Sequence, residues 1–231
     1  MEKIKFSTSG DSALIVSFGN KIKEDINRKV LALCKRIEKE KVKGIVELVP
    51  SYRDVCIFYN PLVTTIRQIK EEVNKYLKEG FSLNEENETK KIIEVPVLYG
   101  GEFGPDLEYV AKYTNLTQEK VIELHSSREY RVYMVGFVSG FPYLGGLNEK
   151  LYVPRRSVPA SKVLKNSVGI GGKQTGIYTI TSPGGWWIIG RSPLDFCKIN
   201  KSSISILAKA GDYIKFKSID KEEYYSLLKT Q

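Results

Sequence analysis

A short run of uncharged polar side chains, Gln174-Thr175-Gly176-Ile177-Tyr178, offers an amide, a hydroxyl and a phenol close together. If this run is a strand, Gln174, Gly176 and Tyr178 share one face, because successive side chains of a strand point to opposite sides. Uncharged donors and acceptors of this kind suit a ligand that carries an amide or a carboxylate. The alternative is turn chemistry around a buried, hydrogen-bonded tyrosine, and the sequence leaves both open.

His125 is the one histidine of the chain, and histidine is the commonest general base near neutral pH. It stands at the end of a helix that we predict over residues 118–126. There it could move a proton, or it could be a C-terminal helix residue favoured by the helix dipole. No GxSxG motif accompanies it, so nothing indicates a Ser–His–Asp triad.

Two cationic points accompany these residues. Arg191 follows an apolar strand candidate, a neighbourhood in which a guanidinium needs a partner. A bound carboxylate or phosphate would serve, and so would a structural ion pair with Asp195. Arg155 and Arg156 form the second point, after Pro154; basic pairs in loops are usually solvated, so this point ranks below Arg191.

The glycine-rich run from Gly169 to Gly176 has some features of a phosphate-binding loop. A Walker loop needs Ser or Thr directly after its lysine and a glycine at a fixed distance before it. Here Gln174 follows Lys173, and Ser167 occupies the earlier position. Backbone N–H groups could still hold an anion, but the pattern argues against a conventional Walker site.

The segment that carries most of these residues, 130–194, is dense in glycine, proline and aromatic residues. Glycine permits positive φ and close backbone approach, and proline fixes turns. We therefore predict short strands separated by demanding turns, with a further strand over residues 212–217. Many short strands of this kind indicate a closed or nearly closed β-barrel. Short helices are expected before it, over residues 106–112 and 118–126, and a last one over 220–228.

The first ninety residues alternate between strand and helix patterns. The predicted elements are a strand at 13–18, a helix at 22–41, strands at 44–50 and 54–60, a helix at 64–78 and a strand at 92–99. The order β-α-β-β-α-β is that of the ferredoxin-like fold. We expect an α+β protein with domains over residues 1–90 and 91–231, and a flexible polar connection over residues 84–90.

The composition is that of a soluble globular protein, with 42% hydrophobic and 27% charged residues. No run of 18 apolar residues and no signal-peptide layout is present, so we expect a cytoplasmic protein without a membrane span. Three cysteines without a CxxC pair suggest neither a disulfide scaffold nor a metal site. The net charge is +9, and residues 130–200 contain nine Lys or Arg against two acids. This local excess favours an anion-facing surface in the glycine-rich half, while no nucleic-acid-binding motif is present.

Several motifs together resemble the family of 5-oxoprolinase B subunits, also known as KipI and as allophanate hydrolase subunit 1. They are GDSALI from Gly10, GFVSGFPYLGGL from Gly136, the PRR element from Pro154, SVGIGGKQTGIY from Ser167 and SPGGWWIIGRSPL from Ser182. The resemblance covers nearly the whole chain. It implies an N-terminal ferredoxin-like domain followed by a cyclophilin-like β-barrel domain.

The resemblance also implies a function: membership in a multi-protein 5-oxoprolinase complex that opens 5-oxo-L-proline to L-glutamate with ATP and its magnesium. The partners would be a homologous barrel protein, the C component of the oxoprolinase, together with a third protein, the A component. The chain alone would be inactive. A lactam is a stable amide, so its carbonyl must be activated, as phosphoryl transfer from ATP would do.

The family implies two other functions. One is an inhibitor that binds a sporulation histidine kinase through an exposed aromatic anchor, for which Trp186, Trp187 and Tyr143 are candidates. Trp186 and Trp187 should point to opposite faces of a strand, one of them into the core. The other is biotin-dependent carboxyl transfer, as in urea amidolyase, which would need a biotin-carrying partner because this chain lacks a Met-Lys-Met motif.

Site residues follow from the positions that match the family pattern. The resemblance assigns catalysis to His125 and Gln174, and substrate binding to Thr175, Tyr178, Arg191, Tyr143 and Arg155. Arg131, Gly136, Phe141, Pro142 and Trp186 also match. Three positions depart from the pattern: Ser139, Ala160 and Asn166 stand where the family usually has Pro, Arg and Gly.

Overall fold

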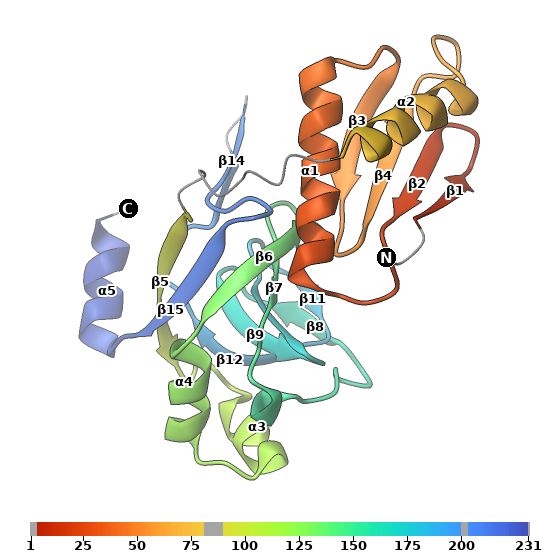
Figure 1. Cartoon of the computed structure of the whole chain (residues 1–231). Helices are drawn as coiled ribbons and strands as arrows, with labels where there is room; N and C mark the ends of the chain where they lie inside the picture. Colours follow the sequence, from red (N-terminus) through yellow and green to blue (C-terminus); the bar gives the residue numbers. More distant parts are fainter. Residues whose placement is uncertain (1–3, 81–89, 200–202, 231) are drawn as a thin grey trace. The chain divides into compact units, whose positions relative to one another are not determined.

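The computed structural model describes residues 4–80, 90–199 and 203–230 (Figure 1). Its contacts divide the chain into two compact units, residues 1–89 and residues 90–231. The connection predicted over residues 84–90 lies outside the described residues except for Lys90. Within the described ranges, no helix is both long and apolar enough to cross a membrane.

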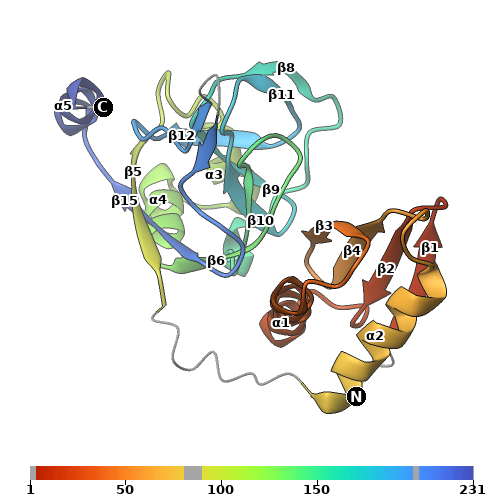
Figure 2. The ribbon, with the colours of Figure 1, turned by 90° about the horizontal axis from the view of Figure 1, so that it is seen from above.

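The first unit is a four-stranded antiparallel sheet with two helices on one face (Figures 1 and 2). Its elements are β1 (Lys5–Ser9), β2 (Ala13–Ser17), α1 (Glu24–Glu40), β3 (Ile45–Pro50), β4 (Asp54–Tyr59) and α2 (Ile66–Glu79). The strand order is β1-β2-β4-β3. Leu14 of β2 and Ile57 of β4 are fully buried against helix residues such as Leu33. A capping box between Thr65 and Gln68 fixes the start of α2.

The β-α-β-β-α-β order predicted for this unit is wrong, because the unit runs β-β-α-β-β-α. The strand predicted at 92–99 is β5 (Ile92–Tyr99), which pairs with strands of the second unit. The missed strand, β1, reads KFSTS and is mostly exposed, so it carries no alternation of apolar residues. A strand pattern also does not say which sheet the strand joins. The ferredoxin-like assignment is therefore not confirmed.

The second unit contains a closed barrel with strand order β10-β7-β6-β15-β5-β12-β9, which confirms the predicted β-barrel. The elements after β5 are α3 (Leu107–Thr114), α4 (Gln118–Ser126), β6 (Glu129–Val135), β7 (Pro142–Gly145), the 3₁₀ turn η2 (Glu149–Leu151), β8 (Ala160–Val163), β9 (Ser167–Gly171), β10 (Gln174–Ile177), β11 (Ser182–Gly184), β12 (Trp187–Arg191), β13 (Cys197–Ile199), β14 (Ile204–Ile206), β15 (Tyr213–Ser218) and α5 (Lys221–Lys229). Strands β8 and β11 form a separate two-stranded ribbon, as do β13 and β14.

The interior of the barrel is a packed core, as in other small barrels. Val132 of β6, Leu144 of β7 and Ile170 of β9 are fully buried in it, and Val110 of α3 and Val121 of α4 join the same cluster. Both helices lie at one end of the barrel (Figure 1). The core thus fixes β9 and β10, and β10 carries the predicted site residues Gln174 and Thr175.

Candidate functional site

The interior of the barrel contains a continuous chain of hydrogen bonds around His125. The Tyr99 hydroxyl lies 2.8 Å from His125 Nδ1, and His125 Nε2 lies 2.8 Å from Thr175 Oγ1. The Thr175 hydroxyl donates to the Gly169 carbonyl at 2.9 Å. Since that donation uses the threonine proton, Thr175 must accept from His125 Nε2–H, and Nδ1 must accept from the Tyr99 hydroxyl.

The inner part of this network is sealed from solvent. His125 and Thr175 are both 0% exposed, and the imidazole stacks on Phe216 with ring centres 4.5 Å apart. Burial lowers the pKa of His125 from 6.5 to about 3, because a charged imidazole would lose its hydration. Burial also raises the pKa of Tyr99 well above 10. At neutral pH the network is uncharged, and it joins α4 to β5 and β10.

The outer face of the same strands has a different composition. The Trp186 indole lies across Gly171 and Gly176, where added side-chain carbons would meet the ring, in the second case at 3.0 Å. Phe141 contacts the indole edge-on at 5.4 Å between ring centres. Trp186 is 4% exposed and belongs to a cluster that also includes Tyr178. Glycine at both positions therefore leaves the space that the indole occupies.

Polar side chains surround this indole. Tyr143 lies 6.1 Å from Trp186 between ring centres and pairs across the strands with Gly176. The Arg155 guanidinium lies 5.6 Å from the centre of the indole ring. Gln174 is the cross-strand partner of Gly171, so its half-buried side chain shares the face on which the indole lies. We call Tyr143, Arg155, Gln174 and Trp186 the outer site.

The electrostatics of the outer site favour an anionic or strongly polar ligand. Burial raises the pKa of both Tyr143 and Tyr178, while the positive charge of Arg155 acts in the opposite direction on each. The two phenols are thus neutral donors at physiological pH, beside an exposed cation. Tyr178 itself is 2% exposed and hydrogen-bonds the Trp186 backbone, so it helps to orient the indole.

Arg191 lies in a different part of the barrel from Arg155. Its guanidinium is 5.5 Å from the centre of the Phe103 ring, within a small cluster that α5 completes through Tyr224. An ion pair with Asp195 was one of the two alternatives for Arg191; in the structure Asp195 pairs with Lys165 at 2.6 Å. The structure therefore brings Tyr143, Tyr178, Arg155 and Gln174 together, but it places Arg191 with Phe103 and Tyr224.

The two consecutive tryptophans point to opposite sides, as predicted. Trp186 belongs to the outer cluster and Trp187 packs partly against the barrel core. Trp187 also donates its indole N–H to the Pro154 carbonyl at 2.7 Å and stacks on Tyr109. Neither indole is a freely exposed anchor.

Asn166, which stands where the family usually has Gly, adopts a backbone conformation that glycine favours. Asn166 has φ of 63°, in the left-handed region that glycine favours and that asparagine tolerates better than most residues. Its carbonyl accepts a hydrogen bond from the Ser192 backbone. Ala160 stands half-buried in β8, against the cluster of Trp186.

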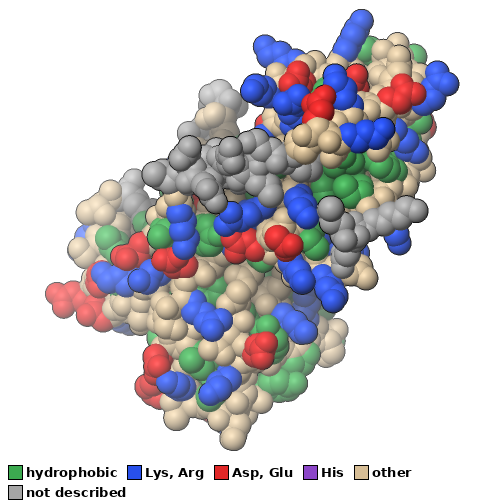
Figure 3. All heavy atoms as spheres, in the orientation of Figure 1, with side chains coloured by type: hydrophobic (Ala, Val, Ile, Leu, Met, Phe, Trp, Pro, Cys, Tyr) green, Lys and Arg blue, Asp and Glu red, His purple; other side chains and the backbone are tan. Residues whose placement is uncertain are grey.

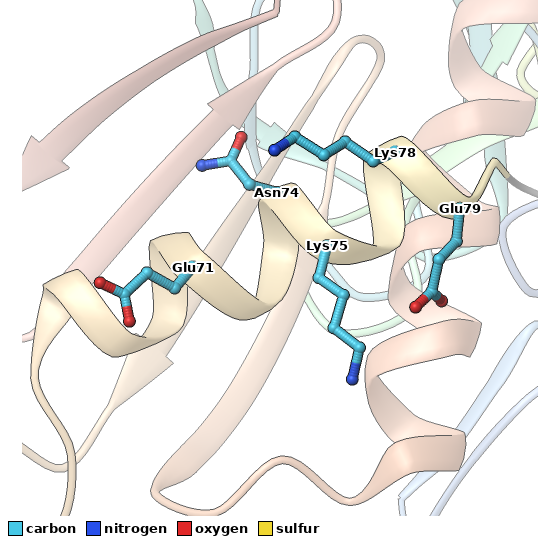
Figure 4. A pocket seen from close by; sticks show the side chains of 5 residues that line it. All are labelled: Glu71, Asn74, Lys75, Lys78 and Glu79. Carbon is cyan, nitrogen blue, oxygen red and sulfur yellow. The ribbon is translucent and has the colours of Figure 1, made fainter.

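A separate hollow of about 680 Å³ lies along α2, lined by Glu71, Asn74, Lys75, Lys78 and Glu79 (Figure 4). Its side chains point in different directions, and Glu79 pairs with Arg36 of α1 at 3.1 Å. On the face seen in Figure 3, basic and acidic side chains are interspersed.

No group of three His, Cys, Asp or Glu residues in the described ranges is arranged to hold a metal ion.

Sequence reasoning missed two contributors to these sites. Tyr99 completes the His125 network but ends a strand that was predicted as the last member of the β-α-β-β-α-β series. Asp106 accepts hydrogen bonds from Arg156 and from the Ile188 backbone, although it was seen only as the start of a helix. Neither residue has a neighbour in the sequence that would reveal its partner, since the partners lie 26 to 82 residues away.

Residues 4–207, which include most of both units, match the family described as carboxyltransferase domain, subdomain C and D. The chain is also 39% identical to the 5-oxoprolinase B subunit of Bacillus subtilis, over 94% of this chain and 93% of that protein. The chain therefore belongs to the carboxyltransferase subdomain C and D family, together with the 5-oxoprolinase B subunits.

Solved structures agree with this assignment. A conserved uncharacterised protein of Pyrococcus horikoshii is 46% identical, with a TM-score of 0.55 over 95% of this chain and 100% of that chain. The K. lactis urea amidolyase has a TM-score of 0.81 over 99% of this chain and 15% of its own; at 18% identity this likeness shows the fold alone. Another solved chain, 30% identical with a TM-score of 0.78, is longer, and this chain covers 40% of it.

Proposed function

We propose that this chain belongs to an ATP-dependent complex that opens 5-oxo-L-proline to L-glutamate, and that the outer site contributes groups to substrate binding. The observation that carries the proposal is the 39% identity to a 5-oxoprolinase B subunit over nearly the full length of both chains. The partners would be a homologous barrel protein together with a third protein, and the chain alone would be inactive.

The outer site suits the chemistry of this substrate. Arg155 can bind the carboxylate of 5-oxo-L-proline through two parallel hydrogen bonds. The neutral Tyr143 phenol can donate to the lactam oxygen, and the Gln174 amide can both donate and accept at the lactam. ATP with its magnesium would supply the phosphoryl group that activates the carbonyl, and positioned donors then stabilise the charge that develops on oxygen.

The internal residues would act differently from the prediction that they touch substrate. His125 and Thr175 lie behind β10, with Gln174 and Gly176 on its other side. In this proposal they hold the strand in place, and their influence reaches the substrate through the position of Gln174. Arg191, which packs over Phe103, would support the barrel near α5.

The test is ATP-dependent release of glutamate from 5-oxo-L-proline, measured for the chain alone and for the mixture with its partner proteins. We expect glutamate release only from the mixture, and none from the chain by itself. The Arg155→Ala variant should raise KM about 10- to 100-fold, since a hydrogen bond to a charged group contributes about 1.5–3 kcal/mol. Arg67→Ala, which removes an arginine whose side chain is 86% exposed on α2, is the matched control and should change nothing.

No activity in any mixture, with the partners shown to be folded, would contradict the proposal and favour the inhibitor of a histidine kinase. That alternative needs an exposed aromatic anchor. Phe137, which is 62% exposed beside the Trp186 cluster, offers one. It contacts Phe141 edge-on at 5.7 Å between ring centres. Binding to a kinase that is lost in Phe137→Ser and kept in Gln174→Ala would identify this second function.

A further inference from the structure

We propose that Asp106, Arg156 and Trp187 form a clamp that positions Arg155 over the outer site. They are positioning residues, because Asp106 and Trp187 contact the loop that carries Arg155 and Arg156 belongs to that loop. The effect of the clamp on substrate binding rests on the proposed function above. The positioning of Arg155 itself does not, and it can be measured separately.

The Asp106 side chain hydrogen-bonds to this loop and to strand β12, and not to the N-terminus of its own helix. It occupies the N-cap position of α3, where an aspartate usually accepts from the first backbone N–H groups, yet its side chain makes no such bond. Instead, one carboxylate oxygen accepts from Arg156 Nη2 and the other from the Ile188 backbone N–H, the latter at 2.7 Å. The Asp106 side chain is 13% exposed and that of Arg156 is 27% exposed, so water screens the pair weakly.

The residues on both sides of Arg155 are fixed. The Pro154 carbonyl accepts from the Trp187 indole N–H at 2.7 Å, and the Arg156 backbone N–H donates to the Gly185 carbonyl at 2.8 Å. The Arg156 guanidinium lies 4.2 Å from the centre of the Trp187 ring. The backbone at Arg155 is therefore held by its neighbours.

Two consecutive arginines thus meet two consecutive tryptophans. Arg156 lies on Trp187 and is neutralised by Asp106, while Arg155 lies on Trp186 and is exposed. One pair is closed and structural, and the other is open to a ligand. Because an arginine loses several rotatable bonds of freedom when it binds an anion, fixing its backbone beforehand lowers the cost of binding.

Asp106→Asn tests the clamp with little change in shape. Both oxygens of Asp106 accept from N–H donors, so an amide must turn its own NH₂ toward one of them. We expect KM for 5-oxo-L-proline in the assembled complex to rise about 2- to 10-fold, with kcat within about twofold. In an Arg155→Ala background the same substitution should add nothing to KM, because the clamp acts through Arg155.

The matched control is Glu108→Gln. Glu108 is also on α3 and pairs with Lys112 at 2.7 Å, but both side chains are more than half exposed, so KM should not change. An equal rise in KM from Asp106→Asn with and without Arg155 would mean general damage and would overturn the clamp.

A second readout is independent of catalysis. The chain has two tryptophans, so an amide-correlation NMR spectrum contains two indole N–H signals, which Trp187→Phe assigns. Asp106→Asn and Arg155→Ala should both shift the Trp186 indole signal. Glu108→Gln should shift neither of the two indole signals. A Trp186 signal unchanged by Asp106→Asn would overturn the positioning. A shifted signal with a normal KM in Arg155→Ala would support the positioning and overturn the assignment of Arg155 to substrate.

Discussion

The two faces of strand β10 have different environments, although both carry uncharged side chains. Thr175 and Ile177 point into the barrel, where Thr175 joins a sealed chain of hydrogen bonds with His125. Gln174 and Gly176 point outward, to the indole of Trp186 and the exposed cation of Arg155. A shift of one residue along the strand thus separates an uncharged core from a face that lies beside an exposed cation.

This difference shows that residue type alone is a weak guide to role. His125, the obvious reactive side chain, has both ring nitrogens in hydrogen bonds and a pKa of about 3. The outer site depends instead on Gly171 and Gly176, because a side chain at either position would meet the Trp186 indole. The inner face should therefore control stability, and the outer face should control binding.

Removing the histidine should have the largest effect and should fall on stability. His125→Ala deletes a buried, stacked ring and leaves the Tyr99 and Thr175 hydroxyls without their partner. We expect a loss of about 3–5 kcal/mol in the free energy of unfolding, measured by denaturant titration. Gln174→Ala, on the other face, should cost less than about 0.5 kcal/mol. Similar losses in both variants would remove the distinction between the faces.

The acid sensitivity of the fold should come in part from the same histidine. Burial lowers the pKa of His125 from 6.5 to about 3, so between these values the unfolded chain binds a proton that the folded chain does not. The stability contributed by neutral His125 is complete above pH 6.5 and is lost as the pH falls toward 3. Between about pH 6 and pH 4 this linkage should cost about 2.5 kcal/mol.

The comparison that isolates this contribution uses His125→Gln, which keeps a donor and an acceptor but does not titrate. Carboxylates protonate equally in both proteins, so the difference between their stability curves belongs to His125. Parallel curves from about pH 6 to pH 4 would show that the imidazole is protonated in the fold, and that the interior is wetter than its burial indicates.

The sequence predicted the elements and the alternation along them better than it predicted partners. The helix at 118–126, the closed barrel and the opposite directions of Trp186 and Trp187 follow from local periodicity and turn residues, which are properties of neighbouring positions. The membership of Ile92–Tyr99 in the barrel does not, because a strand has the same pattern in either sheet.

Partners at long range were out of reach for a physical reason. The hydrogen bonds from His125 to Tyr99 and Thr175 join residues 26 and 50 positions apart, and the barrel closure that brings them together is a property of the whole fold. The sequence left two partners open for Arg191, a bound anion or the nearby Asp195, and in the structure Lys165 pairs with Asp195. Charge in a sequence indicates that a partner is needed and leaves its identity open.

The last prediction concerns a substitution on the outer face. Gly171→Ala would place a methyl group in the Trp186 indole, which must shift and take the contact with Arg155 with it. We expect a loss of about 1–3 kcal/mol in stability from overpacking, and a raised KM for 5-oxo-L-proline in the assembled complex. The matched control is Gly185→Ala, one residue before the indole, where an added carbon has nothing within 4 Å.

The dependence of stability on pH should stay in Gly171→Ala as it is in the unaltered protein, because His125 lies behind the strand and keeps its partners. Denaturant titrations of both proteins across the acid range measure this directly. A changed pH dependence would mean that the two faces are coupled through β10, and that the separation of stability from binding fails.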